Sequence, residues 1–229
     1  TADAGSDAAA TGGDSGAASE TSTAGDAGTA CAEAGAVLFC DDFDTSEIAA
    51  RWDGVQQLTG GTAAKTTDSP VRTPPNALAS KTPGTGGTGR VYKVFAGDYK
   101  RLRVALDVAV KSFAAGGGGS TGLVTLSFAS ARLELAMFHE SGNGNIHFLM
   151  YEVSGNGTHD LTVTDPGVLP QDGEWIHLEL EVALTLQTVS LRQGVFASAN
   201  GEATRALPAS SGQFTLAVGS VTSPGSAPA

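Results

Sequence analysis

The segment 38–44, LFCDDFD, places three carboxylates, Asp41, Asp42 and Asp44, within four positions and next to two phenylalanines, Phe39 and Phe43. Carboxylates this close together are typical ligands of a hard cation such as calcium, or members of an acid/base pair. If the segment is the first strand of a domain, neighbouring side chains point to opposite faces, which separates Asp41 from Asp42. We therefore expect the end of a strand. The alternative is a structural calcium ion bound by Asp42, Asp44 and backbone carbonyl groups.

The chain has two cysteines: Cys40 lies within the same segment, and Cys31 lies nine positions before it. Two cysteines at the start of a domain predict a disulfide in an exported protein, and two free thiols are the alternative. The loop of about ten residues would contribute about 2–3 kcal/mol in the chain-entropy description. A zinc site is not indicated, because no CxxC motif or histidine lies nearby.

Polar side chains that alternate with apolar ones could form a binding face. Recognition of sugars requires planar donors and acceptors together with an aromatic ring for stacking. If the central strands line one sheet, the polar residues expected to converge are Arg101, Arg103, Arg132, Glu134, His147 and Tyr151. The alternative is the solvated outer face that antiparallel sheets commonly have. We expect Trp52 and Trp175 to serve in packing.

The motifs of the common hydrolases give little support for an enzyme. No H-E-x-x-H motif accompanies the four histidines, and the one formal G-x-S-x-G match, at 118–122, lies in the glycine-rich run 114–122, which we expect to be a turn. Glu134 and Glu140 would lie about 20 Å apart on one strand. Paired glycosidase carboxyl groups lie within about 5–10 Å of each other. The sequence therefore predicts no catalytic residue.

Strands of alternating polarity must position these residues. In 99–111, YKRLRVALDVAVK, every second residue from Leu102 to Val110 is apolar and the residues between them are polar or alanine. The same period of two recurs in 131–138, 145–151 and 174–182, and it predicts strands buried on one side. Clusters rich in glycine and asparagine separate these runs and supply turns.

One helical turn is expected around 45–51, capped by Thr45 or Ser46, with Ile48 facing inward. About twelve strands and no βαβ unit predict an all-β fold. We expect a two-sheet antiparallel sandwich of the jelly-roll type.

Composition divides the chain of 229 residues into two parts. Residues 1–30 contain no aromatic residue, leucine, isoleucine or valine, so we expect a disordered linker followed by one domain over 31–229. The net charge of -11 and the lack of a basic stripe exclude nucleic acid as an expected partner. No apolar run approaches the ~18 residues of a transmembrane helix.

The run LFCDDFDTSEIAARW resembles the opening of the concanavalin A-like lectin/glucanase superfamily, especially its bacterial laminin-G-like jelly-roll domains. In that opening a tryptophan follows an aromatic–Asp–Asp–Phe strand, and here it is Trp52. The runs SPVRTPPNALAS (69–80) and DGEWIHLELEV (172–182) resemble an edge segment and a late strand of the same family. The family's terminal strand with paired acidic residues and its glucanase motif Glu-x-Asp-x-x-Glu are not found.

The resemblance implies a non-catalytic carbohydrate-binding or surface-recognition module, with glycans or cell-surface polysaccharide as partners and a monomeric state. A polysaccharide hydrolase or lyase on the same fold is one alternative. A structural or adhesive envelope domain without a small ligand is another. The acidic spacer resembles that of bacterial surface lipoproteins, which implies an extracellular or cell-surface location and a lipid anchor upstream of residue 1.

Overall fold

The computed structural model describes most of the chain beyond residue 37. The described residues are 38–44, 47–68, 71–72, 75–83, 86–111, 119–139, 146–154, 157–164, 174–193, 196–202 and 207–222. The expected linker 1–30 and Cys31 lie outside these ranges. The linker, the start of the domain and the Cys31–Cys40 disulfide therefore stay predictions.

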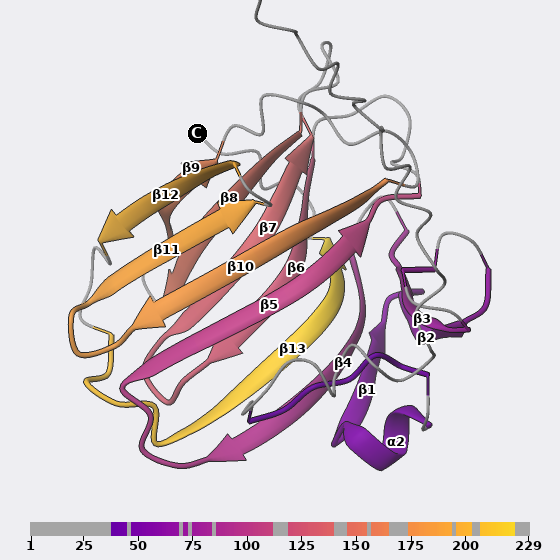
Figure 1. Ribbon diagram of the computed structural model, residues 1–229, viewed down its shortest axis with the longest axis horizontal. Coiled ribbons are helices and arrows are strands. Elements are labelled where there is room, and N and C mark those ends of the chain that lie inside the picture. The colour runs from indigo at the N-terminus through magenta and orange to yellow at the C-terminus, as the bar shows by residue number, and fades with distance from the viewer. Residues whose placement is uncertain are drawn as a thin grey trace, which may run out of the picture.

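Nearly all the regular structure in the described residues is antiparallel strand (Figure 1). The larger sheet has the order β1–β4–β13–β6–β7–β8–β9. Its strands are β1 (Gly54–Leu58), β4 (Gly87–Ala96), β6 (Gly119–Ser127), β7 (Arg132–His139), β8 (Ile146–Ser154), β9 (Gly157–Thr164) and β13 (Gln213–Thr222). We call it the seven-stranded sheet.

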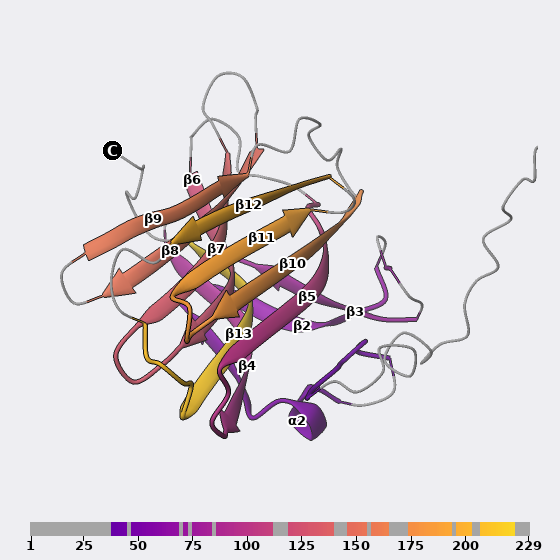
Figure 2. The ribbon, with the colours of Figure 1, turned by 60° about the vertical axis from the view of Figure 1, so that its left-hand side comes forward.

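A four-stranded sheet has the order β12–β11–β10–β5, and β2 and β3 form a separate pair. The strands of these two sheets are β5 (Arg101–Ala109), β10 (Trp175–Ala183), β11 (Thr188–Gln193), β12 (Phe196–Glu202), β2 (Thr62–Thr66) and β3 (Ala77–Lys81). Figures 1 and 2 show β5, β10 and β11 lying across the strands of the seven-stranded sheet. The fold is therefore a two-sheet antiparallel sandwich of the jelly-roll type, as predicted.

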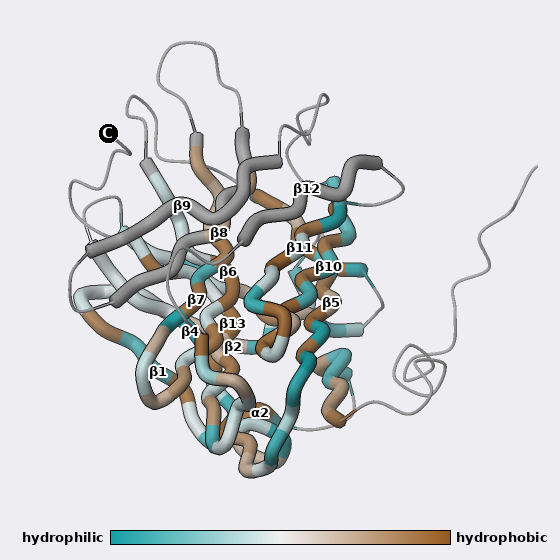
Figure 3. Tube along the Cα trace, turned by 90° about the vertical axis from the view of Figure 1, so that its left-hand side faces the viewer, coloured by the Kyte–Doolittle hydropathy of each residue, from teal (hydrophilic) through white to brown (hydrophobic). Residues whose placement is uncertain are grey.

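The main core lies between the seven-stranded and the four-stranded sheets. Leu102 of β5, Leu178 and Leu180 of β10, and Leu133 and Leu135 of β7 are buried in one cluster. The tube in Figure 3 alternates between hydrophilic and hydrophobic residues along β5 and β10, which confirms the predicted period of two. The alternation works because a strand that packs against a core on one side must show its other side chains to the opposite face.

A second core cluster covers the part of the seven-stranded sheet that the four-stranded sheet does not reach. Trp52, Ala63 and Val91 are its buried members. Half-buried side chains from the N-terminal segment, from α2, from β3 and from β13 pack against them: Phe39, Phe43, Ile48, Leu78 and Val218. The N-terminal segment therefore acts as a cover for one end of the sandwich.

The segment 38–44 is not a strand, so the prediction of a first strand there was wrong. The Asp41 Oδ1 atom accepts a hydrogen bond from the Phe43 N–H at 2.9 Å, and Asp42 Oδ1 accepts one from the Asp44 N–H at 3.1 Å. Phe43 has a φ of 64°, in the left-handed region. Aspartates that bond their own backbone two residues on favour turns over sheet pairing, which explains the difference.

Asp41 also anchors this segment to the second core cluster. Its Oδ2 atom accepts a hydrogen bond of 2.6 Å from the indole Nε1 of Trp52, a residue that is only 5% exposed. The Trp52 ring stacks on Phe43 with centroids 6.1 Å apart and meets Phe39 edge-on at 5.0 Å. In addition, Arg51 donates to the Cys40 carbonyl. These contacts confirm the expected packing role of Trp52.

The expected helical turn is present as α2 (Ile48–Arg51), and Ile48 packs inward as predicted. The expected caps were wrong, because Glu47 occupies the N-cap position and no side chain caps the helix. Among the described residues, no helix is long and apolar enough to span a membrane.

Replacing Asp41 by alanine is expected to lower the free energy of unfolding by about 1–3 kcal/mol, because the buried indole N–H of Trp52 loses its acceptor. Asp42→Ala is the matched control. It removes a bond to the nearby Asp44 N–H, and we expect it to cost no more than about 1 kcal/mol. Urea denaturation followed by tryptophan fluorescence measures both variants. Equal losses would contradict the anchoring role of Asp41.

Candidate functional site

The alternation that builds the core places polar side chains on the outer face of the seven-stranded sheet. Leu133 and Leu135 of β7 lie in the core, so Arg132 and Glu134 lie on the opposite face. Strand pairing then brings polar residues of other strands beside them. We call this set the outer polar cluster: Gln56 of β1, Arg90 of β4, Thr125 of β6, and Arg132 and Glu134 of β7.

Arg90 connects three strands of the cluster. Its Nε atom donates to Gln56 Oε1 at 2.6 Å, and its Nη1 atom donates to Thr125 Oγ1 at 3.3 Å. Thr125 is on β6, so the guanidinium group reaches across β13. The β13 residues that face it are small, Ala217 and Gly219, and this leaves the space that the Arg90 side chain crosses.

Gly219 must be glycine for a geometric reason. Its φ is 141°, and an added Cβ would lie 2.4 Å from the carbonyl oxygen of Gly89. The pairing of β13 with β6 shifts register between Val218 and Val221, so Gly219 lies within the irregularity. Such a bulge changes the local direction of the strand. The approach of β13 to β4 therefore depends on the absence of a side chain at this position.

Glu134 is the most enclosed charged residue of the cluster, with a side chain that is 16% exposed. It lies over Gly122, where an added Cβ would approach Glu134 Oε1 to 2.5 Å. Arg132 Nη2 lies 3.6 Å from Glu134 Oε2, and the Arg132 side chain is 45% exposed.

Burial raises the pKa of Glu134, while the charges of Arg132 and Arg90 oppose this rise. Burial, followed by repulsion from Arg132, lowers the pKa of Arg90.

The six residues predicted to share one binding face are divided between two sheets. Arg132 and Glu134 lie together, and the backbone of β8 places Tyr151 in register with Glu134 and His147 in register with Phe138. The side chains of Tyr151 and His147 are outside the described part of the chain. The ligand-binding roles assigned from the sequence stay predictions.

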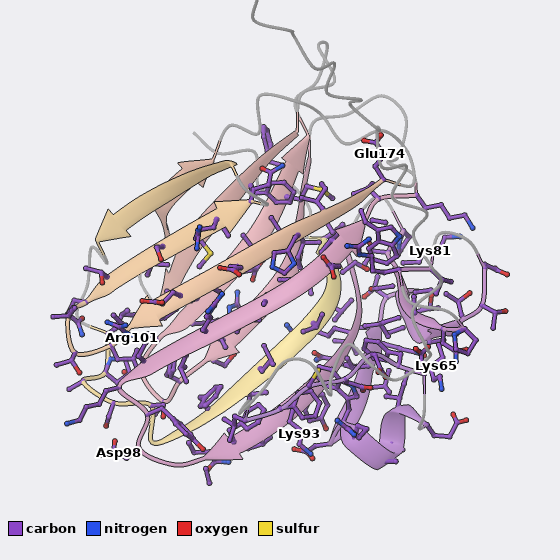
Figure 4. The ribbon with its side chains drawn as sticks, viewed as in Figure 1. Lys65, Lys81, Lys93, Asp98, Arg101 and Glu174 are labelled. Atoms are coloured by element: carbon purple, nitrogen blue, oxygen red, sulfur yellow. The ribbon has the colours of Figure 1, made fainter. Side chains whose placement is uncertain are left out.

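Arg101 and Arg103 do not join the outer polar cluster, contrary to our expectation. They lie on β5, in the four-stranded sheet, and Figure 4 shows Arg101 at the start of that strand. Arg101 Nε lies 3.5 Å from Glu181 Oε1, and Arg103 Nη2 lies 2.6 Å from Glu179 Oε1. The alternation within a strand shows which residues share a face but not which sheet the strand joins.

Ion pairs cover the outer face of the four-stranded sheet. Glu179 lies within 3.5 Å of both Arg192 and His177, besides its bond to Arg103. The hydrogen bond from Arg103 lowers the pKa of Glu179. His177 Nδ1 lies 3.0 Å from Asp107 Oδ1. These are exposed cross-strand pairs, which stabilise a sheet only modestly.

Sequence reasoning missed Gln56, Arg90 and Thr125. The signal for Arg90 was the run 87–96, GTGRVYKVFA, in which small or apolar residues alternate with Thr88, Arg90 and Tyr92. Tyr92 shares the outer face with Arg90, and its ring lies over Gly54, where an added Cβ would meet the Tyr92 hydroxyl at 2.5 Å. The cluster therefore has an aromatic neighbour.

Asp42 and Asp44, the predicted calcium ligands, each direct one carboxylate oxygen at a backbone N–H. Asp42 Oδ1 accepts from Asp44, and Asp44 Oδ1 accepts from Asn76 at 2.9 Å. Asp44 Oδ2 is buried and has no hydrogen-bond partner in the described part of the chain. Calcium takes about six to eight oxygen ligands. Within the described ranges, no group of three or more acidic, histidine or cysteine side chains could hold a metal. These residues alone do not complete a calcium shell, so calcium binding stays a prediction.

Comparison with known proteins gives only distant structural likenesses. No protein-family model and no curated protein matches the chain. The carbohydrate binding module CBM66 from Bacillus subtilis superposes with a TM-score of 0.42 at 13% identity, over 72% of this chain and 91% of that one. LamAcat from Zobellia galactanivorans gives 0.41 at 8% identity, over 73% and 69%.

The kappa-carrageenase from Pseudoalteromonas carrageenovora, in complex with an oligotetrasaccharide of kappa-carrageenan, gives a TM-score of 0.42 at 13% identity. That superposition covers 82% of this chain and 85% of the other. TM-scores of this size assign neither a family nor a function. The function must therefore come from the residues of the outer polar cluster.

Replacing Glu134 by glutamine is expected to change how stability depends on pH. Because the pKa of Glu134 is raised in the folded protein, its contribution is fully present below the unfolded pKa and is lost as pH rises through the folded pKa. Glutamine does not ionise, so the variant lacks this loss. Relative to the wild type, its free energy of unfolding should be higher at about pH 7.5 than at about pH 4.

Glu179→Gln is the control of opposite sign. The pKa of Glu179 is lowered, so its stabilisation is present above the unfolded pKa and is lost as pH falls. Urea denaturation of both variants and the wild type at the two pH values measures the differences. Differences of the same sign in the two variants would contradict the burial of Glu134.

Proposed function

We propose that the chain is a non-catalytic carbohydrate-binding or surface-recognition module that binds its ligand at the outer polar cluster. The observation that carries this proposal is the gathering of guanidinium, carboxylate, amide and hydroxyl groups from four strands on one sheet face. These groups are planar or oriented donors and acceptors of the kind that bind sugar hydroxyls. Tyr92, on the same face, offers an aromatic surface beside them.

We propose a non-catalytic role because Glu134 is the one carboxylate among the described side chains of the cluster. A glycosidase needs two carboxyl groups within about 5–10 Å of each other. The alternative of a hydrolase rests on one backbone observation. Asp160 of β9 is in register with Tyr151 of β8, and Tyr151 is in register with Glu134. Two strand spacings put the Asp160 and Glu134 backbones about 10 Å apart.

We also propose that the protein is exported and tethered at the cell surface by residues 1–30, as a laminin-G-like member of the concanavalin A-like superfamily. The composition of the linker, the order of the sequence landmarks and the two-sheet sandwich support this proposal. A Cys31–Cys40 disulfide would fit an oxidising location. Peptide mass mapping of the unreduced protein tests the disulfide, and recovery of both cysteines as free thiols would contradict it.

The full chain is expected to bind glycans on an array, and Arg132→Gln is expected to weaken binding by about tenfold or more, as for loss of a charged hydrogen bond. Arg192→Gln, which makes the same change of charge on the four-stranded sheet, is expected to bind like the wild type. Running the array with calcium and again with EDTA tests whether a cation takes part.

Three outcomes would contradict the proposed function. Silence towards all glycans by a folded protein would favour the structural or adhesive alternative. If Arg101→Gln lost glycan binding while Arg132→Gln bound like the wild type, the site would lie on the four-stranded sheet instead. New reducing ends released by the wild type, and not by Glu134→Gln, would assign a hydrolase.

A further inference from the structure

Arg90 is a half-buried cation that has no ion-pair partner among the described residues. Its guanidinium group contacts the neutral side chains of Gln56 and Thr125, and no carboxylate in the described part of the chain lies within ion-pair distance of it. Burial and the nearby charge of Arg132 both lower the pKa of Arg90, and the charge of Glu134 opposes this change. Enclosing a cation without a direct ion pair costs free energy, so this arrangement is unfavourable for the protein alone.

On the opposite face of the sandwich, the described arginines do have ion-pair partners. Each described arginine on the outer face of the four-stranded sheet has a carboxylate within ion-pair distance. The pairs are Arg101–Glu181 at 3.5 Å, Arg103–Glu179 at 2.6 Å and Arg192–Glu179 at 3.5 Å. The outer polar cluster instead holds two arginines and one described carboxylate, on a chain whose net charge is -11.

Counting the described residues alone, the guanidinium groups of Arg90 and Arg132 each have N–H donors without an acceptor. Arg90 uses Nε and Nη1, and its Nη2 atom has no acceptor among the described residues. Arg132 lies 3.6 Å from Glu134, which is longer than a hydrogen bond, and its side chain is 45% exposed. A planar guanidinium group with free N–H donors matches a carboxylate or sulfate oxygen pair.

We propose that the outer polar cluster binds an acidic polysaccharide, whose carboxylate or sulfate groups contact the guanidinium groups of Arg132 and Arg90. This inference rests on the proposed function and names its ligand class. Arg90 and Arg132 lie on strands separated by β13 and β6. Their backbones are three strand spacings, about 14 Å, apart, but the reach of Arg90 across β13 to Thr125 brings its guanidinium group closer to Arg132 than that. Two neighbouring cations on one face suit a polymer that carries several anionic groups more than a single neutral sugar.

Glu134 couples this binding to pH. It is the described carboxylate nearest Arg132, and the residues that share its face are Arg132 on β7, Arg90 on β4, and the neutral Thr125 and Gln56 on β6 and β1. In the backbone register, Tyr151 and Asp160 continue the row on β8 and β9. A bound anion beside Glu134 disfavours its ionised form. The affinity for a sulfated polymer should therefore rise as pH falls.

Dextran and dextran sulfate form a matched pair of probes, and polygalacturonate supplies the carboxylate. The full chain is expected to bind both polyanions at least about tenfold more tightly than dextran, and to release them as the salt concentration rises. Arg132→Gln and Arg90→Gln should each lose about tenfold in affinity for the polyanions, as for loss of a charged hydrogen bond. Arg192→Gln should bind like the wild type. Isothermal titration calorimetry measures these affinities.

A second variant guards against misfolding of Arg90→Gln. Arg132→Lys keeps the charge at an exposed position and removes the planar fork, so a loss of affinity in this variant, with an unchanged circular dichroism spectrum, supports guanidinium recognition. A preference between dextran sulfate and polygalacturonate identifies the anionic group.

The outcomes separate this inference from the proposed function. Binding of neutral glycans on the array without a preference for polyanions would overturn the inference and leave the proposed function standing. Equal losses in Arg192→Gln and Arg132→Gln would show nonspecific attraction to cationic residues and would also overturn it. Silence towards neutral and anionic polymers alike would overturn both.

Discussion

The inner face of the seven-stranded sheet has to be kept from water, and the rest of the structure depends on how this is done. The four-stranded sheet covers one part of that face and forms the main core with it. Other parts of β4 and β13, around Val91 and Val218, are covered by Trp52 and the phenylalanines of the N-terminal segment, together with residues of β2 and β3. The bond between Asp41 and Trp52 holds this cover in place. The acidic segment that first suggested chemistry is therefore built into the architecture.

The same burial decides what the outer face can hold. Since a strand shows alternate residues to opposite sides, the burial of Val91 on β4 and of Leu133 and Leu135 on β7 places Arg90, Arg132 and Glu134 outside. Small residues on β13 then let Arg90 reach Thr125 on β6, so residues from four strands meet in one cluster. The glycine at 219 is part of this arrangement, because a side chain there would collide with the backbone of β4.

The two outer faces of the sandwich differ in how their charges are satisfied. On the four-stranded sheet, arginines and carboxylates meet across neighbouring strands and neutralise each other in contact with water. On the seven-stranded sheet, Glu134 is enclosed, and the hydrogen-bond partners of Arg90 among the described residues are neutral. Charges that are partly removed from water and incompletely paired are costly, and such sites are common where a ligand completes the set. This contrast makes the seven-stranded sheet the better candidate for binding.

By itself, the sequence determined the strands and their inward residues, since the period of two along 101–109 or 175–183 depends only on local alternation. It also predicted the position of the helical turn near Ile48 and the packing role of Trp52. Only the tertiary structure decided which strands share a sheet, because pairing joins residues far apart in the chain: β13 lies between β4 and β6, while β5 pairs with β10. For that reason Arg101 and Arg103 were grouped with the wrong sheet and Arg90 was missed.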